Sequence, residues 1–380
     1  MKKNIFNVSL VLISLFVVIA LGELILRIIR PDQIVHTGRE FNFHSFDHTY
    51  GWKGKPDATG RFGRYGEYLV QVKNNSMGMR DDEYPVEKKN GLPRFAFLGD
   101  SYTWGFGVEH EQIFMEILEK KYPMNLEAFN LGVSVFSTVQ SYLLFKDLNS
   151  KYHFDYVVLL FATGDMLRNV SREDNGYSRP FAKYKNNQLI IENIPVKEKA
   201  TVRSGLRHDV FILRLLSLLK AKLQKKTIST KELPNFNYGL ASGQLPGKHI
   251  NDGRNDHAYK VTKEVLRDMN MYCKNKKIKL IVLLNTSTWQ FEEDYKKRAL
   301  NAYNGDKGSV DWELPQKKMM AILSELNIPY LNLLPYLQKR YANTGEHPHF
   351  RIDGHYSPAG HKMIAAELYQ FLLRSNILDI

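Results

Sequence analysis

The sequence predicts an α/β protein in which helices cover both faces of a parallel sheet. Apolar runs at 95–98, 156–161 and 278–284 are typical of strands that are buried on both faces. Segments with helical spacing separate these runs, and strands that alternate with helices form a parallel sheet. The chain has 380 residues, of which 43% are hydrophobic, so it can bury one large core and a small appendage.

The individual elements follow from the spacing of apolar residues. The first strand stops at Gly99, and a tight turn leads to Phe114, Ile117 and Leu118, which have helical spacing. The later elements are expected as strands at 126–130, 156–161, 278–284 and 329–333, and as helices at 138–148, 257–273 and 316–326, with a closing helix that contains Met363, Ile364, Leu368, Phe371 and Leu372.

Ser101 follows the first strand in the run Gly99-Asp100-Ser101. Open α/β sheets bind ligands at the carboxyl ends of their strands, so a serine there can act as a nucleophile with backbone N–H groups nearby. Asp-Ser pairs also commonly cap helices, and the stretch alone leaves both interpretations open.

Asp353 and His355 lie two residues apart in a loop before the closing helix. A serine nucleophile needs a base to take its proton, and the base needs a group that orients it. If the preceding strand is parallel to the first strand, this loop lies at the same edge of the sheet as Ser101.

Four blocks in this order resemble the SGNH/GDSL hydrolase family. Gly99-Asp100-Ser101 matches the nucleophile block, and Asp353 with His355 matches the final acid and base. The segment 130–134 is similar to the second block, and 161–166 stands where the third block is expected. The resemblance extends from Phe95 to the C-terminus and includes lipase-like acylhydrolases, membrane-anchored members and related polysaccharide O-acetyltransferases.

The resemblance implies a flavodoxin-like three-layer α/β/α sandwich and a catalytic triad of Ser101, His355 and Asp353. It also implies an oxyanion hole formed by the backbone N–H groups of Ser101 and Gly132. The third-block asparagine is replaced here by Asp165, and an ionised carboxylate has no proton to donate. Asp165 could therefore repel the oxyanion, donate to it when protonated, or turn away and pair with Arg168.

The N-terminus predicts a membrane anchor. Lys2 and Lys3 precede an apolar run at 5–26, and about 20 apolar residues are enough to cross a bilayer. A secretory signal peptide that is cleaved after Ala20-Leu21-Gly22 is the alternative. We expect an uncleaved anchor at 1–30, a β-rich preamble at 31–90 and an extracytoplasmic hydrolase domain at 91–380.

Charge and cysteine content exclude several other classes of protein. The formal charge is +13, but the lysines are scattered and no nucleic-acid recognition motif accompanies them, so anionic surfaces are the expected partners. A single cysteine, Cys273, excludes an intrachain disulfide framework. The spacing of His347 and His349 does not favour zinc, and neither a metal nor a cofactor is expected.

Together these features predict an esterase that removes acyl groups, above all O-acetyl groups, from an extracytoplasmic carbohydrate. Two alternatives stay open, a polysaccharide O-acetyltransferase of the same fold and a catalytically weak member that binds or scaffolds glycans. An insertion at about 170–256 is expected over the rim of the active site, where loops commonly decide specificity.

Overall fold

A five-stranded parallel sheet forms the centre of the computed structural model, which describes residues 2–29, 40–64, 66–88, 91–174, 176–198, 254–294, 296–297, 311–375 and 377. Its strands are β5 (Arg94–Gly99), β6 (Glu127–Gly132), β7 (Tyr156–Phe161), β12 (Lys279–Leu284) and β13 (Tyr330–Asn332). They lie in the order β13-β12-β7-β5-β6, and every neighbouring pair is parallel. Numbered along the chain, this is the 2-1-3-4-5 order of flavodoxin-like folds. The predicted parallel sheet is confirmed.

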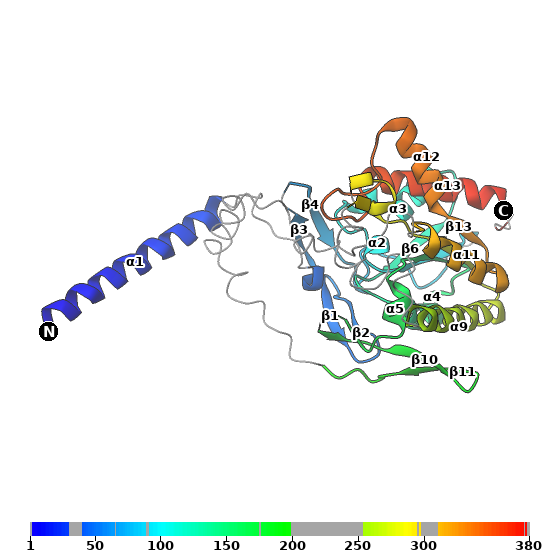
Figure 1. The fold of residues 1–380 in the computed structure, drawn as a ribbon, viewed down its shortest axis with the longest axis horizontal. Coiled ribbons are helices and arrows are strands. Elements are labelled where there is room, and N and C mark those ends of the chain that lie inside the picture. The colour runs from blue at the N-terminus through cyan, green and yellow to red at the C-terminus, as the bar shows by residue number, and fades with distance from the viewer. Residues whose placement is uncertain are drawn as a thin grey trace.

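Alternate residues of the strands enter two separate cores, one on each face of the sheet. Phe95 and Phe97 pack in one core, whereas Ala96 and Leu98 pack in the other. The first core is covered by α3 (Phe114–Lys121), α12 (Leu333–Thr344) and α13 (Pro358–Arg374), and the second by α4 (Thr138–Tyr152), α9 (Arg254–Asn275) and α11 (Leu314–Glu325) (Figure 1).

The elements differ from the prediction chiefly at the end of the sheet. The helices expected at 138–148, 257–273 and 316–326 are confirmed as α4, α9 and α11. The last strand, however, ends at Asn332, where the prediction extended it to Leu333. The Asn332 side chain accepts a hydrogen bond from the Leu334 N–H at 3.2 Å and so caps α12, a helix that the sequence analysis did not predict.

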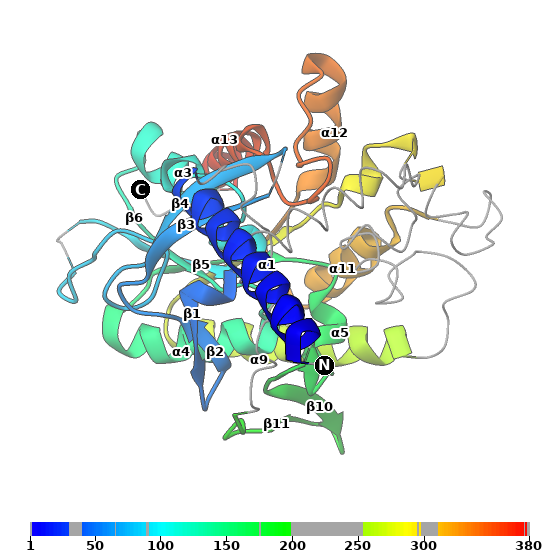
Figure 2. The ribbon, with the colours of Figure 1, turned by 90° about the vertical axis from the view of Figure 1, so that its left-hand side faces the viewer.

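Two antiparallel hairpins lie ahead of the sheet domain, next to one another in Figure 2. After the short helix η2 (Glu40–Phe43), β1 (His44–Asp47) pairs with β2 (Gly51–Gly54), and β3 (Thr59–Arg64) pairs with β4 (Tyr68–Lys73). The second hairpin packs Phe62, Val70 and Val72 against Trp104 and Phe106, which directly follow the turn that carries Ser101.

The described part of the predicted insertion consists of short strands. These are β8 (Glu173–Asp174), β9 (Tyr177–Ser178), β10 (Phe181–Lys185) and β11 (Gln188–Glu192). β10 packs through Ala182 against Val261 and Val265 of α9. The apolar helical stretch that the sequence predicts at 210–223 lies outside the described residues.

The N-terminal apolar run forms α1 (Lys2–Ile29), a single helix of 28 residues. None of the helices in the described ranges combines the length and the hydropathy needed to cross a membrane. The predicted anchor at 5–26 is therefore not confirmed.

Candidate active site

Ser101 occupies the first position of the short helix α2 (Ser101–Trp104), immediately after β5. The turn requires glycine at position 99, because its φ is 151° and a Cβ there would lie 2.2 Å from Thr103 Oγ1. The Asp100 side chain accepts a hydrogen bond from the Tyr102 N–H at 3.1 Å and caps the helix. Asp100 thus performs the capping role, and the hydroxyl of Ser101 remains available for other contacts.

Ser101, His355 and Asp353 meet at the carboxyl end of β5, although 254 residues separate the first two in sequence. The Ser101 Oγ lies 2.7 Å from His355 Nε2, and His355 Nδ1 is hydrogen-bonded to Asp353 Oδ1. A carboxylate only accepts hydrogen bonds, so Nδ1 carries the proton and Nε2 is free to accept the Ser101 hydroxyl. This arrangement allows the imidazole to take the serine proton.

The loop that carries His355 is closed by a β-bridge between His349 and Tyr356. Within it, the Phe350 N–H donates to the His355 carbonyl at 2.8 Å, and the Gly354 N–H donates to the Phe350 carbonyl at 3.0 Å. The ring of Phe106 stacks on the imidazole with a centroid separation of 4.1 Å. The imidazole is thereby fixed by a ring contact as well as by its two hydrogen bonds.

Asp353 is 3% exposed and has further polar partners from the β3–β4 hairpin. Its Oδ2 accepts a hydrogen bond from the Tyr68 hydroxyl at 3.1 Å and lies 3.5 Å from Arg64 Nε. Burial acts to raise the pKa of Asp353, but His355, Arg64 and Tyr68 together hold it below its usual value. The carboxyl is therefore ionised at neutral pH. The sequence analysis did not identify Tyr68, which no local pattern connects to a loop 285 residues away.

The Gly132 N–H, which the family resemblance assigns to the oxyanion hole, has a partner within the protein. Its N–H donates to the side-chain oxygen of Asn130 at 3.0 Å, so it is already engaged. A Cβ at position 132 would lie 2.4 Å from the Trp104 backbone nitrogen. Glycine is needed there because β6 and α2 approach closely, and the oxyanion role of Gly132 stays a prediction.

Asp165 begins the short helix α5 (Asp165–Asn169) and turns towards Arg168. Its Oδ1 accepts from Arg168 Nη1 at 3.2 Å, and its Oδ2 accepts from the Ala162 N–H at 3.2 Å. The same Nη1 donates to Asp100 Oδ2 at 2.8 Å. Burial and the nearby Asp100 raise the pKa of Asp165, while Arg168 acts in the opposite direction. Of the three alternatives, the contacts match the one in which Asp165 pairs with Arg168.

Replacing Asp165 with asparagine should lower stability without increasing turnover. An amide offers one acceptor oxygen where the carboxylate offers two, so either the contact with Arg168 or the hydrogen bond from the Ala162 N–H is lost, at a cost of about 1–3 kcal/mol in the free energy of unfolding. Denaturant unfolding and ester-turnover kinetics of Asp165→Asn measure both effects. A tenfold gain in kcat would show that the side chain at position 165 reaches the oxyanion.

Potential metal ligands gather away from the triad. Ligand atoms of Asp81, His110 and Glu116 all lie within 4.8 Å of one another. Lys120 Nζ lies 3.0 Å from Glu116 Oε2, however, so an ammonium group already supplies positive charge to this cluster. Near the triad, His349 Nε2 lies 3.2 Å from Thr286 Oγ1, and burial lowers the pKa of His349.

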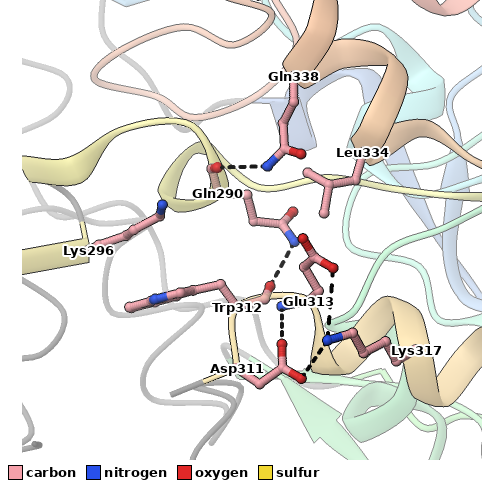
Figure 3. Close-up of a pocket in the computed structure, with 8 residues that line it drawn as sticks. All are labelled: Gln290, Lys296, Asp311, Trp312, Glu313, Lys317, Leu334 and Gln338. Carbon is pink, nitrogen blue, oxygen red and sulfur yellow. Dashed lines mark hydrogen bonds and ion pairs between the residues drawn. The ribbon is translucent and has the colours of Figure 1, made fainter. Parts of the chain in front are cut away.

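A pocket of about 320 Å³ is lined by residues from α11, from α12 and from the segment around Gln290, and no triad residue lines it (Figure 3). The short helix η6 (Thr288–Gln290) connects the pocket with the loop that carries His355, because Thr288 Oγ1 donates to the Gly354 carbonyl at 3.4 Å and Gln290 lines the pocket. Most of the lining is polar. Its residues are Gln290, Lys296, Asp311, Trp312, Glu313, Lys317, Leu334 and Gln338.

No protein-family model and no curated protein sequence matches the chain. Three solved structures illustrate its likeness to known folds. A lipolytic G-D-S-L family protein from Veillonella parvula has 13% identity over 75% of this chain and 100% of its own, with a TM-score of 0.38. The esterase EstA from a Pseudoalteromonas species has 10% identity over 74% of this chain and 98% of its own, with a TM-score of 0.38.

An acetylxylan esterase from Geobacillus stearothermophilus has 14% identity over 75% of this chain and 96% of its own, with a TM-score of 0.37. The three matches, to a G-D-S-L lipolytic protein, an esterase and an acetylxylan esterase, each extend across about three quarters of this chain.

Proposed function

We propose that the chain is a carboxylic ester hydrolase in which Ser101 is the nucleophile, His355 the general base and Asp353 the group that orients the base. The observation that carries this proposal is the continuous hydrogen-bonded series from Ser101 Oγ through His355 to Asp353 at the carboxyl end of β5. A series of this kind both deprotonates the serine and stabilises the imidazolium that results.

In the first step Ser101 Oγ attacks the ester carbonyl while His355 Nε2 accepts the hydroxyl proton. The carbonyl oxygen then carries negative charge, and the N–H of Ser101 supports it, since the first N–H groups of a helix have no partner within that helix. His355 returns the proton to the leaving alcohol, which departs and leaves an acyl-serine. Water then attacks the acyl group with His355 again as the base, and the acid is released.

We further propose that the substrate is an acylated carbohydrate, above all one with O-acetyl groups. The pocket that Gln290 lines supports this substrate class, because its lining is mainly polar and includes the apolar ring of Trp312. A long acyl chain would instead require a mainly apolar lining. If a sugar hydroxyl replaced water in the second step, the same residues would perform O-acetyl transfer.

Hydrolysis of a chromogenic acetate ester, compared with acetate release from an acetylated polysaccharide, tests both parts of the proposal. Turnover of both substrates, with a preference for acetate over an octanoate ester, is the expected result. A preference for octanoate would reject the carbohydrate substrate. A folded protein that turns over none of them would favour the glycan-binding alternative.

We also propose that α1 attaches the protein to the cytoplasmic membrane with the hydrolase domain outside. The apolar sequence at 5–26 supports this, as do exposed apolar side chains such as those of Leu15, Phe16 and Val18, which are 55%, 72% and 66% exposed. The full chain should sediment with membranes after a carbonate wash. Release as a soluble protein whose N-terminus is Glu23 would identify a cleaved signal peptide instead.

A further inference from the structure

We propose that the β3–β4 hairpin is a working part of the active site, in which Tyr68 and Glu67 position Asp353, the carboxylate that orients the base His355. The inference rests on the proposed function, because it concerns the residue that orients His355. It gives the segment before the sheet domain a role in the chemistry beyond packing.

The Tyr68 hydroxyl donates to Asp353 Oδ2 at 3.1 Å, which leaves Oδ1 for His355 Nδ1. The two oxygens of the carboxylate are therefore divided between the hairpin and the catalytic base. Arg64 Nε, from the same hairpin, lies 3.5 Å from Oδ2, and the Arg64 side chain is only 12% exposed. The hairpin thus holds Oδ2 of the carboxylate, while the imidazole holds Oδ1.

Glu67 fixes the backbone of the same loop. Its two carboxylate oxygens accept hydrogen bonds from the N–H groups of Ile352 at 2.6 Å and Asp353 at 2.8 Å. These N–H groups belong to Asp353 itself and to the residue before it, so Glu67 holds the backbone from which the Asp353 side chain extends. Burial acts to raise the pKa of Glu67, as does the negative charge of Asp353.

Ring contacts also hold the hairpin against the rest of the site. The Tyr68 ring lies 4.8 Å from that of Phe350 at the start of the catalytic loop. Gly107 allows this approach, because a Cβ there would lie 2.8 Å from the Phe350 ring and 3.0 Å from the Tyr68 ring. The ring centroids of Phe62 and Phe106 lie 4.6 Å apart, and the Phe106 ring stacks on that of His355. The hairpin therefore contacts neighbours of both the acid and the base.

The Tyr68→Phe variant tests the proposal, since it removes one hydroxyl and keeps the ring. We expect kcat to fall about tenfold with KM unchanged, because a hydrogen bond to a charged group is lost and the substrate is not contacted. The groups that face Asp353 are His355, Arg64, Tyr68 and Glu67. The Tyr68 hydroxyl partly neutralises the Asp353 carboxylate. Without it the carboxylate stabilises the protonated imidazole more strongly, so the acid limb of the kcat/KM profile should move to higher pH.

Tyr142→Phe is the matched control, because the Tyr142 hydroxyl donates to Asp268 Oδ2 at 2.9 Å between α4 and α9, on the other face of the sheet from α13. It should change thermal unfolding about as much as Tyr68→Phe and leave kcat and the pH profile unaltered. A Tyr68→Phe enzyme whose kcat and acid limb match those of the control would overturn the proposal.

Glu67→Gln provides a second measurement that does not depend on the hydroxyl. The amide keeps one acceptor oxygen, so either Ile352 or Asp353 loses its backbone partner, and kcat should fall severalfold at constant KM. An unchanged kcat in both hairpin variants would leave the hairpin a purely structural role. Failure of the proposed function is a different result, namely that Ser101→Ala retains turnover.

Discussion

Replacing Ser101 with alanine should lower the turnover of an acetate ester by at least about a thousandfold, because the proposed acyl-enzyme forms on the Ser101 hydroxyl. Nothing else in the site changes. Asp100 still caps α2 through the Tyr102 N–H, and His355 keeps its contacts with Asp353 and Phe106. Steady-state kinetics on the purified variant measures the loss.

The same variant should unfold almost like the parent protein. The Ser101 hydroxyl has one hydrogen bond, at 2.7 Å to His355, and its removal costs about 1 kcal/mol in the free energy of unfolding. Ser150→Ala is a matched control, since the Ser150 hydroxyl donates to a backbone carbonyl in α4. It should retain full turnover. Turnover of Ser101→Ala within tenfold of the parent would remove Ser101 from the mechanism.

The parallel sheet could be predicted from the sequence because three of its buried strands also show an apolar run. β5, β7 and β12 consist mainly of apolar residues, a pattern that amphipathic elements do not show. The last strand was harder to delimit, since Leu333 and Leu334 continue the apolar run while Asn332 already caps the next helix. A possible cap inside an apolar run was the signal that could have indicated α12.

The triad could be predicted because its members lie in short, characteristic blocks. The roles of their neighbours depend on hydrogen bonds that a block does not specify. The Asn130 side chain accepts a hydrogen bond from the Gly132 N–H, two residues away. The Arg168 side chain donates one to the Asp165 carboxylate, three residues away. The backbone of Val135 could not be predicted either. Its φ of 65° is rare for a β-branched residue, and no sequence pattern indicates it.

Contacts across the whole length of the chain were the least predictable part of the site. The hairpin residues Glu67 and Tyr68 reach Asp353 over 286 and 285 residues, and the hairpin sequence shows only the alternation of an ordinary strand pair. A tyrosine in such a pattern is equally suited to packing, and Tyr68 does pack against Phe350. Only the fold shows that its hydroxyl meets a carboxylate.

Asp353→Asn should reduce kcat on the order of ten-thousandfold while the protein stays folded. If the amide NH₂ faces His355, it forces the imidazole proton onto Nε2, which then cannot accept the Ser101 proton. If the amide oxygen faces His355, the NH₂ points at Arg64 and Tyr68, and the imidazolium lacks the negative charge that stabilises it. Either orientation leaves the base unable to work.

Because the pKa of Asp353 lies below its usual value, the carboxylate is ionised throughout the neutral and mildly acidic range. The asparagine variant should therefore be impaired across that whole range. Asp268→Asn is the matched control, since Asp268 also accepts a tyrosine hydroxyl, at 2.9 Å from Tyr142, but lies on α9. It should keep its turnover. If kcat of Asp353→Asn stayed within tenfold of the parent at neutral pH, Asp353 would not be the group that orients His355.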